Sequence, residues 1–191
     1  MSSRPEPSTR EMILSCSRRL FSQRSFSQVT IKDIAEQAGV SSALVIKYFL
    51  TKENLFEQTI NFSESARRLF SGEFSQLGQA AVYETLTAPE DAPYSTVRTL
   101  VIGSGDENSL KSVGAKIQTD LKEVLVERIE KEAPHPYPHP QIRAQAALSL
   151  IIGLSVMRRV GDPNFREYPR RELLDYYAAQ FQQIVDGMPQ P

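Results

Sequence analysis

Apolar residues recur at intervals of three and four along most of the chain, which is the spacing of one face of an α-helix. Prolines bound these stretches, because a proline inside a helix lacks the N–H and clashes with the preceding turn. The windows without proline are 8–88, 94–133, 141–162 and 170–188. Strand-like alternation never extends beyond a few residues. The pattern predicts an all-α protein with about nine helices.

The predicted helices cover residues 8–23, 31–38, 42–49, 52–71, 77–86, 94–102, 107–132, 141–160 and 170–186. Ser8 or Thr9 is expected to cap the first of them, because a hydroxyl accepts well from the free N–H groups of a helix start. Thr30 precedes the second helix and has Asp33 three positions later, an imperfect capping box since Glu or Gln is usual there. Gly39 ends that helix at a position where positive φ is often needed.

Two of these helices are only seven to nine residues long and are joined at Gly39-Val40-Ser41. Helices this short are unstable alone, so they require a third helix, which the Leu20-Phe21 stripe supplies. A tight turn with glycine between two such helices is typical of a helix-turn-helix, whose second helix enters the major groove of DNA. On spacing alone, a generic helical hairpin fits equally well.

The residue types around this turn favour the DNA-binding interpretation. The segment from about residue 10 to 58 resembles the N-terminal DNA-binding domain of the tetracycline-repressor (TetR) family of transcriptional regulators. The resemblance lies in Phe26, Thr30, Ile34-Ala35, Ala38-Gly39-Val40-Ser41, Tyr48-Phe49 and Lys52-Glu53-x-Leu55. Two positions depart from it: Ser25 stands where the family usually has Gly, and Ile46 where it favours a Tyr that commonly touches a phosphate.

The recognition helix is expected at about Ser42–Phe49, and its first turn faces base edges. That turn is small or apolar, so sequence readout should depend on methyl contacts and water more than on bidentate hydrogen bonds. Lys47, Tyr48 and Thr30 are within reach of phosphates, and Lys52 places a cation beside a helix N-terminus. The predicted DNA-binding residues are Thr30, Ser41, Ser42, Ala43, Leu44, Lys47, Tyr48 and Lys52.

Net charge first argues against a nucleic-acid partner, because the 191 residues carry only −1. The distribution changes this view: residues 1–52 hold eight Lys and Arg against four Asp and Glu, and the remainder carries −5. A basic N-terminal segment, residues 1–52, which we call the head, therefore precedes an acidic remainder of the chain. We expect a flexible arm at 1–8, a helix-turn-helix domain at 9–52 and a ligand-binding and dimerisation domain at 53–191.

The last two helices are the expected dimer interface, because small residues allow close helix approach and a two-fold copy would complete a four-helix bundle. A monomeric hairpin buried in its own domain is the alternative. The predicted interface residues are Ala146, Ser149, Gly153, Met157, Leu173, Tyr177 and Phe181. In the TetR family, a small apolar or amphipathic ligand binds between the middle helices, and the resemblance implies the same here. Candidate lining residues, each of which also fits a plain core, are Phe62, Leu69, Phe70, Leu100, Ile117 and Leu121.

The sequence offers no phosphate loop, no nucleophile elbow and no metal-spaced cluster. His135 and His139 are four apart, but the prolines around them exclude the helical geometry that a shared metal would need. We therefore predict no catalytic residue, no metal and no cofactor. One cysteine excludes an intrachain disulfide, and the N-terminus lacks a signal-peptide core, so we expect a cytoplasmic protein without a membrane partner.

These observations predict a homodimeric regulator that binds double-stranded operator DNA, acts as a repressor, and releases the operator on binding an unknown small-molecule effector. Two alternatives stay open. One is an all-α small-molecule-binding protein or enzyme whose helix-turn-helix is vestigial. The other is an architectural DNA-binding protein without an effector.

Overall fold

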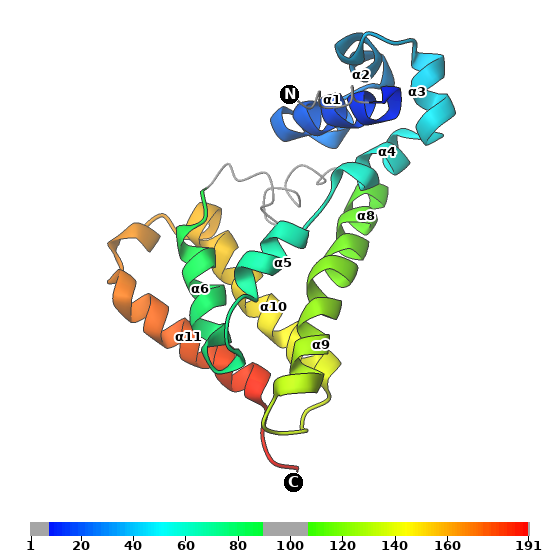
Figure 1. Ribbon diagram of the computed structural model, residues 1–191. Coiled ribbons are helices and arrows are strands. Elements are labelled where there is room, and N and C mark those ends of the chain that lie inside the picture. The colour runs from blue at the N-terminus through cyan, green and yellow to red at the C-terminus, as the bar shows by residue number, and fades with distance from the viewer. Residues whose placement is uncertain (1–7, 90–106, 191) are drawn as a thin grey trace, which may run out of the picture. The chain divides into compact units, whose positions relative to one another are not determined.

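The computed structural model describes residues 8–89 and 107–190, and these residues are all-α, as predicted. They form two compact units, residues 8–61 with 107–116 and residues 62–89 with 117–190, coloured along the chain in Figure 1. The predicted helix at 94–102 and most of the predicted arm at 1–8 lie outside the described residues. Within the described ranges, no helix is both long and apolar enough to cross a membrane.

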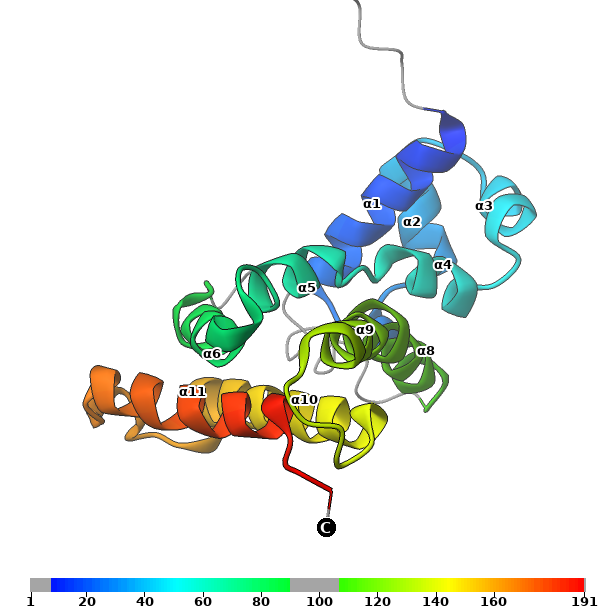
Figure 2. The same ribbon diagram turned by 60° about the horizontal axis from the view of Figure 1, so that its bottom comes forward.

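The first unit begins with four helices and a short 3₁₀ turn, gathered in the upper part of Figure 2. The elements are α1 (Thr9–Gln23), the turn η1 (Phe26–Gln28), α2 (Ile31–Ala38), α3 (Ser42–Phe49) and α4 (Lys52–Thr59). Most of α8 (Glu107–Ile117) also falls in this unit. Both α2 and α3 are eight residues long, so packing against α1 and α4 must supply most of their stability.

The helix starts of this unit are closed by their own side chains. Ser8 caps α1 in a reciprocal capping box with Glu11. At α2, the Thr30 backbone N–H donates to Asp33 Oδ2 at 2.9 Å, and the Asp33 N–H donates to Thr30 Oγ1 at 3.1 Å. The shorter side chain of Asp33 therefore completes the box that Glu or Gln usually makes, and the predicted start of α2 is confirmed.

Aromatic rings form the core of the first unit and set its boundary. The ring of Phe56 lies 5.0 Å from that of Phe21 and 5.1 Å from that of Phe26, measured between centroids. Leu55, one residue earlier on α4, is fully buried. Because α4 packs into this core, the first unit continues to Asn61.

The single helix predicted for 52–71 is interrupted. It ends at Thr59, and α5 (Ser63–Leu69) begins four residues later. Ile60 is extended at φ −80 and ψ 126, and the Phe62 N–H donates to Asp120 Oδ2 at 3.0 Å. A carboxylate 58 residues away along the chain thus accepts the bond that a continuous helix would have made internally, which local periodicity could not reveal.

The second unit is a bundle of longer helices. Its elements are α5, the turn η2 (Phe74–Gln76), α6 (Leu77–Thr87), the π-helical turn η3 (Gln118–Lys122), α9 (Glu123–Glu132), α10 (Pro140–Val156), the π-helical turn η4 (Met157–Gly161), the turn η5 (Phe165–Glu167) and α11 (Arg170–Asp186). The run predicted at 107–132 is helical throughout, but it widens to π geometry at η3.

Helices α6 and α11 lie side by side in both views (Figures 1 and 2) and approach closely at Gly78. A Cβ atom at Gly78 would stand 2.2 Å from the Ala178 carbonyl oxygen. Gln182 joins the same helices, because its Nε2 donates to the Phe74 carbonyl at 3.0 Å and its Oε1 accepts from the Gly78 N–H at 2.9 Å. Glycine is therefore required at this crossing.

A buried arginine holds the end of α11 against the proline-rich connection before α10. Arg143 Nη1 donates to the His135 carbonyl at 2.9 Å and to the Val185 carbonyl at 3.2 Å. Burial lowers the pKa of Arg143, and nearby Asp186 partly opposes that shift. The Met188 N–H donates to the Tyr137 carbonyl at 2.7 Å. The connection at 133–140 is therefore tied to the C-terminal segment and is more than a spacer.

Candidate nucleic-acid interface

The turn between α2 and α3 has the geometry predicted for a helix-turn-helix. Gly39 adopts φ 65 and ψ 31, the left-handed region that glycine occupies without strain. Ser41 then caps α3 by accepting from the Leu44 N–H at 3.2 Å. Val45 and Phe49 anchor α3 in the core, since both are fully buried. These contacts orient α3 so that its opposite face remains open to solvent.

Most of the predicted DNA-binding residues lie on that open side or at its edges. Thr30, Ser41, Ala43, Lys47 and Tyr48 are exposed, and Ser42 and Leu44 are half-buried. The centroid of the Tyr48 ring lies 6.4 Å from that of the Phe49 ring, and Tyr48 is 42% exposed. Tyr48 therefore packs at the edge of the core and remains accessible to solvent. The DNA contacts of these residues remain predictions.

Lys52 has contacts within the unit. Its Nζ donates to the Phe26 carbonyl at 3.0 Å and to the Val29 carbonyl at 3.1 Å, and it stands 4.0 Å from the centroid of the Phe26 ring. Two of its three N–H groups are thus occupied by the segment between α1 and α2. Sequence reasoning assigned this ammonium to DNA, whereas the structure gives it an internal role in joining η1 to α4.

Replacing Lys52 with Ala is expected to destabilise the helix-turn-helix unit by about 1.5–3 kcal/mol, because two carbonyls lose a charged donor. The measurement is thermal unfolding, followed by amide exchange at Phe26–Val29. Lys52→Met is the matched control, since it keeps the apolar stem and removes only the ammonium. Lys52→Met should recover little of the stability that Lys52→Ala loses. An unchanged unfolding temperature in both variants would contradict the internal role and return Lys52 to a DNA contact.

Charge on this part of the chain is predominantly basic. Residues 8–52 hold seven Lys and Arg against three Asp and Glu. The three acids are engaged locally: Glu11 and Asp33 in helix caps, and Glu36 in an ion pair with Lys32 at 3.9 Å. The Thr30 backbone N–H, with the Thr30 hydroxyl, holds the pKa of Asp33 below its ordinary value. Such a surface suits a polyanion.

In the second unit, one face of α10 is exposed as the dimer hypothesis requires. Ala146, Ser149 and Gly153 follow one another along this face, and Met157, the first residue of η4, is 45% exposed. On α11, Leu173 and Tyr177 are half-buried. These positions leave an apolar and small-residue surface on which a second copy could pack.

Phe181 was wrongly placed at that interface. Its side chain is 0% exposed within the chain itself, because the side of α11 that carries Phe181 and Val185 packs into the core of the second unit. The exposed aromatic residue of α11 is instead Tyr176, which is 62% exposed. The helix is rotated relative to the predicted stripe, since α11 has apolar residues on both sides.

The predicted effector lining is mostly core. Phe62, Leu69 and Leu121 are buried, Ile117 is half-buried, and Leu100 lies outside the described residues. Phe70 does border an open hollow of about 500 Å³ between α5 and the η3–α9 segment. The hollow is lined by Ser63, Ala66, Arg67, Phe70, Ser71, Thr119, Asp120 and Val124. It combines apolar surface with both signs of charge, as an amphipathic ligand would require.

Two protein-family models match the chain, one near its N-terminus and one over most of the remainder. Residues 13–59 match the family described as bacterial regulatory proteins, tetR family. Residues 75–185, more than half of the chain, match the tetracyclin repressor-like C-terminal domain. The chain belongs to the TetR family. That family is one of bacterial regulatory proteins, and the curated relatives that the chain matches are HTH-type transcriptional regulators.

Individual relatives of this TetR-family chain are distant. The HTH-type transcriptional regulator BetI of Serratia proteamaculans is 24% identical over 58% of this chain. The chain spans about half the length of the curated relatives that it matches, and 51% of this one. A TetR-family regulator of Streptomyces coelicolor A3 is 24% identical, with a TM-score of 0.59 over 97% of this chain and 99% of its own. NalD of Pseudomonas aeruginosa is 21% identical, with a TM-score of 0.58 over 91% and 96%. At these identities the two structures support the fold alone.

The two departures from the TetR pattern have different consequences. Ser25 has φ −63 and starts η1 with its N–H donating to Gln28 Oε1 at 3.1 Å, so no glycine is needed there. Ile46 is 49% exposed, and an aliphatic side chain replaces the phenol of the family pattern. Sequence reasoning treats Ile46 only as a lost phosphate contact and does not single out Leu50, which directly follows α3 and is 70% exposed.

Proposed function

We propose that this TetR-family regulator is a homodimeric repressor that acts in the cytoplasm and leaves its operator when a small apolar or amphipathic ligand binds. The observation that carries the proposal is the exposed side of α3, held in place by the buried Val45 and Phe49 and set within a basic segment. A recognition helix needs this combination of a rigid base, an open face and basic residues in the segment around it.

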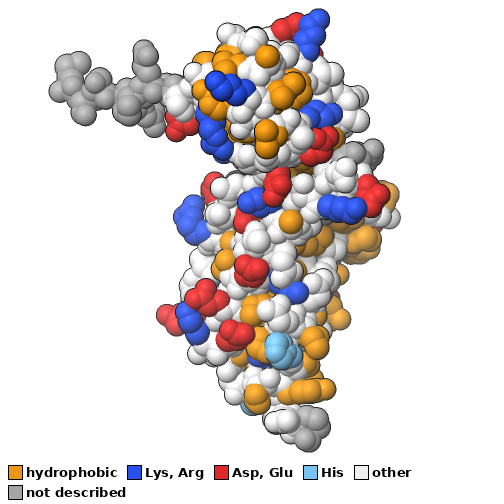
Figure 3. All heavy atoms as spheres, turned by 90° about the vertical axis from the view of Figure 1, so that its right-hand side faces the viewer, with side chains coloured by type: hydrophobic (Ala, Val, Ile, Leu, Met, Phe, Trp, Pro, Cys, Tyr) orange, Lys and Arg blue, Asp and Glu red, His pale blue; other side chains and the backbone are white. Residues whose placement is uncertain are grey.

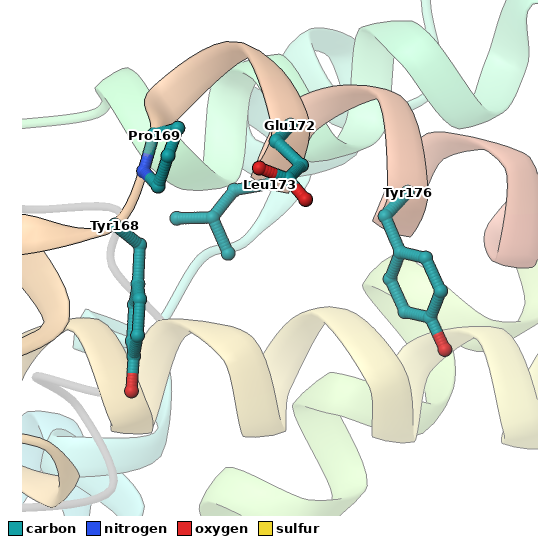
Figure 4. Close-up of a pocket in the computed structure, with 5 residues that line it drawn as sticks. All are labelled: Tyr168, Pro169, Glu172, Leu173 and Tyr176. Carbon is teal, nitrogen blue, oxygen red and sulfur yellow. The ribbon is translucent and has the colours of Figure 1, made fainter.

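Dimerisation is supported by the apolar side of α10 and α11 that is left open in a single chain. Ile142 is exposed on α10, one turn before Ala146, and Tyr176 is exposed on α11. At the start of α11, a hollow of about 260 Å³ is lined by Tyr168, Pro169, Glu172, Leu173 and Tyr176. Figure 4 shows the two tyrosine rings on either side of Leu173. A side chain of a second copy would fill this hollow, and two recognition helices would then meet successive major grooves.

Effector binding is supported by the hollow beside Phe70, whose volume of about 500 Å³ falls in the range of small-molecule sites. A fully packed second unit would favour an architectural protein without an effector. Asp120 lines the hollow and also accepts from the Phe62 N–H at the start of α5. A ligand that changed this bond would favour one arrangement of α5 over another, which is the differential interaction that regulation requires.

We propose repression, and not activation, because of the similarity in fold to NalD. NalD is described as the secondary repressor of the MexAB-OprM multidrug efflux pump. That description concerns NalD, but it makes repression the first hypothesis for this regulator. A reporter fused to the promoter beside its own gene should rise when the gene is deleted, and small molecules that release the purified complex would identify the effector.

The full-length protein is expected to form a specific complex with DNA selected from the region beside its gene, with Kd on the order of 10⁻⁸ M or tighter at physiological salt. Lys47→Ala should weaken binding to all duplexes about equally and reduce the slope of log K against log salt by about two for the dimer, because one phosphate contact is lost from each of its two heads. Fluorescence anisotropy over a range of salt concentrations measures both effects.

The control for this variant is Lys131→Ala, which removes an equal charge on α9 where Lys131 pairs with Glu127 at 2.6 Å. Its salt slope should match that of the unmodified protein. If Lys47→Ala changes sequence preference instead of the slope, the phosphate role is wrong. If no duplex competes better than random DNA, the operator-binding proposal itself fails.

A further inference from the structure

Three exposed apolar residues, Ala43, Ile46 and Leu50, form one side of α3 and its C-terminal end, and we refer to them as the apolar reading face. Ile46 is 49% exposed and Leu50 is 70% exposed. Ala43 and Ile46 are three residues apart on α3, so they lie on one side of the helix, and Leu50 directly follows Phe49, its last residue. Val45 and Phe49, on the opposite side, are fully buried. The reading face is therefore presented to solvent by a rigid helix.

Leu50 occupies this face at a cost in backbone conformation. It has φ 65 and ψ −55, and the Thr51 N–H donates to the Phe49 carbonyl at 2.7 Å, which closes a γ-turn of the rare positive-φ form. Glycine adopts this conformation with little strain, whereas a residue with a Cβ atom is strained in it. Strained residues of this kind cluster at functional sites. An exposed leucine at such a point contributes little to the core, so a role outside the fold explains it better.

The chemistry of the reading face selects one feature of DNA. Alanine, isoleucine and leucine side chains have no hydrogen-bond donor or acceptor, so they cannot read the polar edges of bases. In the major groove, the apolar group that base edges present is the C5-methyl of thymine. The surroundings fit a polyanion, since residues 8–52 carry seven basic against three acidic residues. Figure 3 shows hydrophobic and basic side chains next to one another on this unit.

We propose that the apolar reading face specifies the operator by packing against thymine methyl groups, with Ile46 at the centre of the contact. This inference rests on the proposed operator binding and names the base that the site selects. Lys47 and Tyr48, beside the face, position α3 on phosphates and contribute no base preference. Half-sites should therefore contain thymines at fixed positions in the major groove that α3 enters.

The test begins with selection of duplexes that the full-length protein binds from a random pool. Each thymine of the selected site is then replaced by uracil, which removes only the methyl group. We expect about a fourfold loss of affinity for each methyl that packs on the face, from the free energy of burying one methyl group. Replacements at thymines outside the half-sites should leave affinity unchanged.

A double-mutant cycle assigns the contact to Ile46. In Ile46→Ala, replacement of the contacted thymine by uracil should cost less than twofold, because the partner of the methyl is already gone. Leu50→Gly should lower affinity for the selected site while leaving the unfolding temperature unchanged or higher, since it relieves backbone strain. Met12→Ala is the matched control: it truncates an exposed apolar residue on α1 and should change neither quantity.

Three results would overturn the inference. If a specific complex forms but uracil is tolerated within twofold at every position, operator binding stands and thymine readout is wrong. If Ile46→Ala and Leu50→Gly both bind every duplex as the unmodified protein does, the face serves another partner. If no specific complex forms at all, the inference falls together with the operator-binding proposal on which it rests.

Discussion

Gly78→Ala is expected to destabilise the second unit by about 3 kcal/mol, a fall of about 6–12 °C in Tm for a chain of this size. The added methyl would stand 2.2 Å from the Ala178 carbonyl oxygen and 3.0 Å from the Gln182 nitrogen. Both neighbours are backbone atoms of α11, so they cannot move aside as a flexible side chain would. The helices must separate, and the hydrogen bonds that join Gln182 to Phe74 and Gly78 lengthen with them.

The control for Gly78→Ala is Gly114→Ala on α8, where an added methyl meets no heavy atom within 4 Å. Alanine has the higher helix propensity, so this variant should gain about 0.5–1 kcal/mol. Both variants are compared by calorimetry and by chemical denaturation. A Gly78→Ala protein as stable as the Gly114→Ala protein would show that the close approach of α6 and α11 is not the basis of the second unit.

Gly153→Lys is expected to convert the proposed dimer to a monomer without loss of monomer stability. Gly153 lies on the exposed face of α10, and a Cβ there meets no heavy atom of its own chain within 4 Å. In an isolated chain, lysine should even stabilise α10 by about 0.5–1 kcal/mol through helix propensity. At a closely packed two-fold interface, the same side chain would bury a charge and separate the helices.

Light scattering after size exclusion measures the mass, and anisotropy measures operator affinity. Affinity should fall on the order of a hundredfold or more, because each head then binds its half-site without the other. Gly114→Lys, the same change at another exposed helical glycine, should leave mass and affinity unchanged. A Gly153→Lys protein that remains dimeric would place the interface elsewhere and remove the α10 face from the proposal.

Local signals were sufficient for much of the first unit. Ser8, Thr30 and Ser41 cap the helices that they precede, and Gly39 adopts the left-handed conformation expected of it. Each of these features depends on residues within four positions of one another, so a single sequence contains the whole interaction. The recognition helix, and with it the family, followed from the same short range.

Side-chain roles that depend on distant partners were not accessible in this way. Lys52 looks like any basic residue at a helix start, yet its Nζ binds carbonyls of Phe26 and Val29. The start of α5 depends on Asp120, which accepts from the Phe62 N–H. In both cases the decisive partner lies more than twenty residues away, and no local spacing rule connects them.

The sequence alone was enough to establish an all-α chain, its helix-turn-helix and the basic charge of its head, because helix periodicity, capping and charge are written in neighbouring residues. The orientation of each helix was settled only by packing. Because α11 has apolar residues on both sides, its sequence does not say which side packs inward, and in the structure Phe181 is buried and Tyr176 is exposed. The same reasoning applies to α3, where burial of Val45 and Phe49 is what turns Ile46 and Leu50 toward solvent.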